Sequence, residues 1–109
     1  MATTLKVLGQ SYPTATVLTA LYTVPGATSS VGSSLTIANL SAVNDTFRVA
    51  VRVGGAGISN EHYLYYDIPI NGKDTFVATL GITLAATDVV SVYSENGTLA
   101  FNLFGQETT

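Results

Sequence analysis

The stretch DTFRVAVRV, residues 45–53, decides the fold of this chain. Neighbouring side chains of an extended strand point to opposite faces of a sheet. Phe47, Val49, Val51 and Val53 then lie on one face, and Thr46, Arg48, Ala50 and Arg52 lie on the other. This two-residue period predicts a strand with one buried face and one exposed face.

The same period recurs along the chain. No window places apolar residues at helical spacing, and β-branched Thr and Val, which favour strands, are abundant. We therefore expect at most one or two helical turns. Further strands are predicted at residues 5–8, 17–24, 35–39, 62–68, 76–82, 89–93 and 99–104. This spacing predicts an all-β fold, an antiparallel β-sandwich of seven or eight strands, jelly-roll or Ig-like, with no substantial helix.

Glycine-containing pairs mark turns between the predicted strands. Asn96-Gly97 suits a type I′ turn, in which both central residues have positive φ, and it predicts a hairpin over residues 89–104. Asn71-Gly72 predicts a second hairpin of the same kind. Pro25-Gly26 ends the second strand, and the GGAG sequence at residues 54–57 opens a longer connection.

The length of 109 residues fits one domain, residues 1–109. Apolar residues make up 47% of the chain and the mean hydropathy is +0.38, which is high for a small domain with a wet surface. Other subunits are therefore expected to cover part of its apolar surface. Residues 1–12 and 103–109 are candidate assembly arms, since terminal segments fray unless a neighbour holds them.

Charge and residue usage exclude several classes of function. Only 10% of the residues are charged, and four basic against seven acidic side chains offer no basic stripe for nucleic acid. The chain has no Cys, which removes disulfides and thiolate metal sites, and no calcium-loop spacing occurs. Neither a secretory signal nor a membrane-spanning segment is recognisable, so we expect no membrane association. No cofactor and no metal are expected.

Residues 60–67, NEHYLYYD, contain the single His, two of the seven acidic residues and three of the six Tyr residues. A catalytic arrangement would pair His62 with Glu61 or Asp67. Adjacent strand residues point to opposite faces, however, and no motif supplies a Ser nucleophile. We therefore expect no enzymatic activity.

Aromatic and basic residues suggest contact surfaces instead. Tyr63 and Tyr65 are predicted to share one strand face, as a platform for sugars or for a protein partner, with His62 beside them. Tyr93, Phe101 and Phe104 alternate in the last predicted hairpin and are expected in the core or at a subunit contact. Arg48 and Arg52 also share a face, where they either grip an acidic neighbour or simply solubilise the strand.

The order of several short segments resembles a known group of proteins. The segments are LYTVP (21–25), TIAN (36–39), FRVAV (47–51), HYLYYD (62–67), LGITL (80–84), DVVSVY (88–93) and LAFNLFG (99–105). In order and spacing they resemble small virion structural proteins of tailed bacteriophages, of the cyanophage and marine phage type. The resemblance covers nearly the whole chain.

This resemblance implies a non-enzymatic particle component, made in the host cytoplasm and located in the virion. It carries over no catalytic residues. The expected role is an accessory surface protein that decorates or stabilises the capsid, or that forms part of the tail, baseplate or fibre apparatus. Its expected partners are other virion proteins and further copies of itself, with a trimer favoured. The alternative is a host-facing carbohydrate-binding module that recognises a surface glycan.

Overall fold

The computed structural model describes residues 2–109 and contains eight strands with two single-turn helices. The strands are β1 (Thr3–Ser11), β2 (Thr19–Thr23), β3 (Ser29–Asn39), β4 (Asp45–Arg52), β5 (Tyr63–Ile70), β6 (Thr75–Leu84), β7 (Val89–Ser94) and β8 (Leu99–Thr108). The 3₁₀ helices η1 (Val53–Gly55) and η2 (Asn60–His62) lie in the β4–β5 connection. The predicted all-β fold without substantial helix is confirmed.

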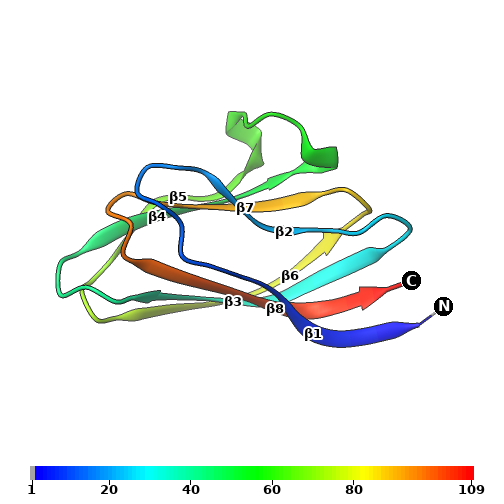
Figure 1. Ribbon diagram of the computed structural model, residues 1–109, viewed down its shortest axis with the longest axis horizontal. Helices are drawn as coiled ribbons and strands as arrows, with labels where there is room; N and C mark the ends of the chain where they lie inside the picture. Colours follow the sequence, from blue (N-terminus) through cyan, green and yellow to red (C-terminus); the bar gives the residue numbers. More distant parts are fainter. Residues whose placement is uncertain (1) are drawn as a thin grey trace.

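Two antiparallel four-stranded sheets pack face to face (Figure 1). One sheet has the strand order β1-β8-β3-β6 and the other the order β2-β7-β4-β5. Eight strands that pass between two sheets in this interleaved order form a jelly roll. An Ig-like domain would instead place seven or nine strands in a different order. The jelly-roll alternative of the sequence prediction is therefore the one observed.

The predicted hairpins at Asn96-Gly97 and Asn71-Gly72 are wrong. β7 and β8 belong to different sheets, as do β5 and β6, so each connection crosses the sandwich instead of folding back beside its own strand. A type I′ turn needs positive φ at both central residues. In the first turn Gly97 has a φ of 73°, but the φ of Asn96 is not positive. In the second turn neither Asn71 nor Gly72 has a positive φ, and the residue that does is Lys73.

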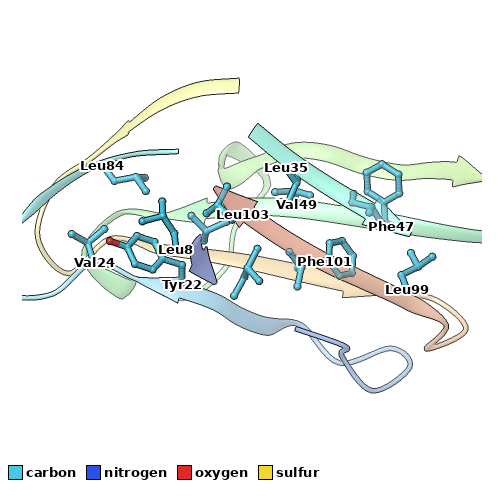
Figure 2. Packing of buried hydrophobic residues seen from close by; sticks show 14 of the residues in the cluster. Leu8, Tyr22, Val24, Leu35, Phe47, Val49, Leu84, Leu99, Phe101 and Leu103 are labelled. Carbon is cyan, nitrogen blue, oxygen red and sulfur yellow. The ribbon is translucent and has the colours of Figure 1, made fainter. Parts of the chain in front are cut away.

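Alternating residues of both sheets fill the core (Figure 2). In the predicted stretch, Phe47 and Val49 are fully buried, and Phe47 packs against Phe76 and Phe101 at ring-centroid distances of 5.1 and 6.5 Å. Burial of each such side chain contributes about 1.5–3 kcal/mol. The alternation predicted for residues 45–53 fails at its last residue. β4 ends at Arg52, and Val53 is 68% exposed in η1 instead of buried.

The two terminal segments lie side by side in the sandwich (Figure 1). β1 pairs with β8 from Thr3 opposite Thr108 onwards, and Ala2 and Thr109 exchange two backbone hydrogen bonds of 3.1 and 2.9 Å. Of the segments expected as assembly arms, residues 1–12 and 103–109, residues 2–9 are therefore paired with 103–109, while residue 1 lies outside the described residues. Among the described residues, β8 is paired along both edges, with β1 and β3, whereas β1 is an edge strand that is paired along one edge only.

Candidate functional site

A β-bulge in β5 decides which tyrosines are exposed. Tyr63 lies opposite Ala50 of β4, and Tyr65 lies opposite Val49, so Leu64 has no counterpart of its own. Ala50 and Val49 point to opposite faces, and the extra residue therefore sends Tyr63 outward and Tyr65 inward. The ring of Tyr65 packs 6.0 Å from that of Phe47 in the core. The predicted placement of Tyr63 and Tyr65 on one face is wrong for this reason.

A second bulge brings Tyr66 to the outer surface. Tyr65 and Ile68 lie opposite Val49 and Phe47, so Tyr66 and Asp67 together face the single residue Arg48. Asp67 has a φ of 52°, in the left-handed region that Asp tolerates better than most residues. Sequence periodicity missed Tyr66, because a regular strand would have turned it inward.

Arg48 lies between two aromatic rings on this outer surface. Its guanidinium carbon is 4.3 Å from the ring centroid of Tyr66 in β5 and 4.2 Å from that of Tyr93 in β7. Arg48 Nε donates to Asp67 Oδ1 at 2.6 Å, and this bond is the main reason that the pKa of Arg48 is raised. Cation–π contacts of this kind contribute about 0.5–1 kcal/mol each at exposed sites.

Tyrosine contacts extend this arrangement in both directions. Tyr63 and Tyr66 are in edge-to-face contact, with centroids 4.9 Å apart and planes at 83°. Tyr93 donates its hydroxyl to Glu95 Oε2 at 2.7 Å, and this hydrogen bond raises the pKa of Tyr93. Tyr63, Tyr66, Arg48 and Tyr93 thus form one continuous group across β5, β4 and β7, which we name the aromatic row.

An open pocket of about 360 Å³ lies at one end of the aromatic row. Asn60, Tyr63 and Tyr66 line it. Asn60 is the first residue of η2, and it lies close to the row because η2 leads directly into β5, the strand that bears Tyr63 and Tyr66. The two rings meet nearly at a right angle and form a corner with the Asn60 amide close by.

His62 is not hydrogen-bonded to either of its acidic neighbours, Glu61 and Asp67. His62 Nδ1 accepts a hydrogen bond of 3.1 Å from the Ser59 backbone N–H, which fixes the η2 turn. Its Nε2 lies 3.8 Å from Glu61, while Asp67 is bound to Arg48. His62 thus holds the η2 turn and Asp67 holds Arg48, while the Glu61 side chain is exposed.

The other two predicted contact residues lie elsewhere. Arg52 shares the face of Arg48, but it donates to Ser91 Oγ at 3.1 Å and to the carbonyls of Gly55 and Ala56, so it anchors the glycine-rich connection. Phe104 lies on the outer face of the opposite sheet, between Val7 and Ser34 in register. Tyr93 and Phe104 therefore do not belong to one aromatic group.

Among residues 2–109, no group of three or more His, Cys, Asp or Glu side chains is placed to hold a metal ion. No helix in this part of the chain has the length and apolar character needed to cross a membrane. Comparison with protein-family models gives no match for this chain, and comparison with curated proteins gives none either. A function therefore has to be inferred from the residues of the chain itself.

Proposed function

We propose that the chain is a non-enzymatic structural component of a tailed-phage virion, either an accessory surface protein of the capsid or a part of the tail, baseplate or fibre apparatus. The observation that carries this proposal is the outer face of the β1-β8-β3-β6 sheet. Within the described residues, register and burial place no acidic or basic side chain on this face. We name it the uncharged face.

The uncharged face combines exposed apolar residues with small polar ones. Leu5, Val7 and Val77 are 78%, 46% and 64% exposed. Around them, in register, lie Val31, Ser34, Thr36, Thr79, Asn102, Phe104 and Gln106. An ordinary soluble surface is about 25–35% charged. The cores of protein interfaces are depleted of charge, so a face of this composition suits burial against protein.

Further copies of this chain are the proposed occupants of the uncharged face. Two such faces can meet without like-charge repulsion and without desolvating an ion. The other outer face differs, because Arg48 and Asp67 lie on it. A virion supplies many copies in fixed symmetry, where weak contacts add up by avidity. The jelly-roll fold, which also occurs in viral capsid proteins, agrees with this proposal.

The test is the copy number of the protein per purified particle of the phage that encodes it, measured by quantitative mass spectrometry against the major shell protein. A ratio comparable to the shell subunit would assign it to the capsid surface. A small multiple of the tail symmetry would assign it to the tail, baseplate or fibre. Absence from purified particles would refute the proposal.

A further inference from the structure

We propose that the corner formed by Asn60, Tyr63 and Tyr66 is a binding site for a neutral saccharide. This inference uses the face opposite to the uncharged face, and it does not depend on whether the chain is part of a virion. The site differs from the predicted Tyr63–Tyr65 platform, because Tyr65 is turned into the core.

The corner has the shape and rigidity for a pyranose ring. Its volume of about 360 Å³ lies at the small end of the range for ligand pockets. Tyr66 is 54% exposed, and its ring is in contact with both Arg48 and Tyr63. A ring held in this way loses little conformational freedom on binding. It offers an apolar surface for the C–H groups of a sugar.

Polar groups for the sugar hydroxyls stand beside the rings. The hydrogen bonds near the corner join Tyr93 to Glu95, Arg48 to Asp67 and Ser59 to His62. Within residues 2–109, the Asn60 amide and the hydroxyls of Tyr63 and Tyr66 therefore keep free donors and acceptors. Apolar rings with a few such groups bind a ligand that is itself both apolar and hydroxylated.

The charges around the corner favour a neutral ligand. Arg48, the one basic side chain in the aromatic row, is already paired with Asp67 at 2.6 Å and covered by two rings. Glu61 follows Asn60 directly in the chain and adds an exposed carboxylate beside the corner, whereas Glu95 lies at the other end of the aromatic row, against Tyr93. An acidic sugar would be repelled by the Glu61 carboxylate, and the guanidinium of Arg48 is already paired with Asp67. Uncharged hexoses and N-acetylhexosamines are the matching class.

The experiment titrates the full-length ¹⁵N-labelled protein with the methyl glycosides of glucose, galactose and N-acetylglucosamine, and follows the amide chemical shifts. We expect saturable shifts at residues 60–67 with at least one of these probes, and weaker binding of glucuronic acid. Tyr66→Ala should weaken binding about tenfold or more, because it removes an aromatic contact surface. Asn60→Ala should weaken binding several-fold without loss of a hydrogen bond inside the chain.

Tyr12→Ala is the matched control, because Tyr12 is a 58% exposed tyrosine that lines a different pocket, with Gln10 and Asn102. It should bind the probe as the unsubstituted protein does. Since Tyr66 packs on Arg48, the thermal unfolding of Tyr66→Ala is measured as well, and Asn60→Ala keeps the test valid if Tyr66→Ala does not fold. Absence of saturable shifts with all three glycosides overturns the proposal. So do unchanged affinity in Asn60→Ala, or binding of glucuronic acid as tight as that of the neutral probes.

Discussion

At the scale of single residues, Asp45 joins the start of β4 to the β7–β8 connection. It is 3% exposed, and its carboxylate accepts hydrogen bonds from Ser94 Oγ at 2.7 Å, Thr98 Oγ1 at 2.8 Å and Asn96 N at 2.9 Å. Burial alone would raise the pKa of Asp45. The hydrogen bonds outweigh burial and hold the pKa below its ordinary value of 3.8.

Asp45 is therefore expected to make the fold acid-sensitive. Because its pKa is lower in the folded than in the unfolded chain, its contribution is present above about pH 4 and is lost as the pH falls through the folded value. Asp45→Ala would leave several buried donors without an acceptor, and we expect a loss of about 3 kcal/mol in the free energy of unfolding at pH 7. Urea unfolding at pH 7 and at about pH 3 checks both points. An Asp45→Ala variant as acid-sensitive as the unsubstituted protein would contradict the assignment.

Tyr22 predicts a second pH limit, on the alkaline side. It is 7% exposed and donates its hydroxyl to Glu107 Oε2 at 2.6 Å. Burial, and then this hydrogen bond, raise the pKa of Tyr22 from 10.0 to about 12. The contribution of Tyr22 to the stability of the fold is therefore complete below about pH 10 and is lost as the pH rises through about 12.

Tyr22→Phe tests this limit. We expect the variant to lose about 1–2 kcal/mol of stability at pH 7, where the hydrogen bond to a carboxylate is missing. Between about pH 10 and 12, the free energy of unfolding should fall less for Tyr22→Phe than for the unsubstituted protein, as measured by urea unfolding. Tyr12→Phe, at an exposed position, serves as the control for general alkaline effects. Equal alkaline slopes in Tyr22→Phe and the unsubstituted protein would rule out this role.

At the scale of elements, β8 is held tightly between β1 and β3. Gly105 of β8 lies opposite Lys6 of β1 and Gly32 of β3. A Cβ at residue 105 would overlap the backbone carbonyl of Val31 and touch the side chain of Leu8. A backbone neighbour cannot rotate away as a side-chain end can, so the central strand admits only glycine here.

Gly105→Ala is therefore expected to destabilise the protein by about 3 kcal/mol, at the upper end of ordinary overpacking. Gly57→Ala is the matched control, because a Cβ at residue 57 would meet no atom within 4 Å. The control should change the free energy of unfolding by less than about 0.5 kcal/mol. Both values come from urea unfolding. Similar stabilities for the two variants would show that β8 can move away from β3.

The bulges of β5 explain how far periodicity could predict the candidate site. Alternation correctly placed Arg48 and Arg52 on one outer face of β4. It failed for Tyr65 and Tyr66, because the extra residues of β5 are visible only in its pairing with β4. Asp67 has a φ of 52°, but nothing in the sequence around it distinguishes it from a residue of a regular strand. The aromatic row could be found only from the structure.

At the scale of the whole molecule, the two outer faces of the sandwich differ in chemistry. One is the uncharged face, and the other bears the aromatic row with its paired ions. The core of residues such as Leu35, Phe47 and Phe101 separates them. The two proposed binding surfaces therefore do not overlap.

Val77→Lys tests whether the uncharged face associates with itself. Val77 is 64% exposed on β6, so we expect the fold to lose less than about 0.5 kcal/mol. A lysine buried between two copies would meet no counter-ion on this face, and self-association should weaken about tenfold or more. Sedimentation velocity measures this. Val43→Lys is the control, since Val43 is 67% exposed in the β3–β4 connection, off the face. Association of Val77→Lys as tight as that of Val43→Lys would refute the assembly role.

The sequence by itself determined the all-β class, the approximate position of every strand and the low content of charged residues. These properties depend on local alternation, on β-branched residues and on composition, which can be read without knowing any partner strand. Only the tertiary structure decided which sheet each strand joins, where β5 bulges and which outer face lacks charge. Pairing is long-range: β1 meets β8 across almost the whole chain, and the Asn-Gly turns cross between sheets instead of closing hairpins. Strand register, and with it the face on which each side chain lies, is fixed by these distant contacts.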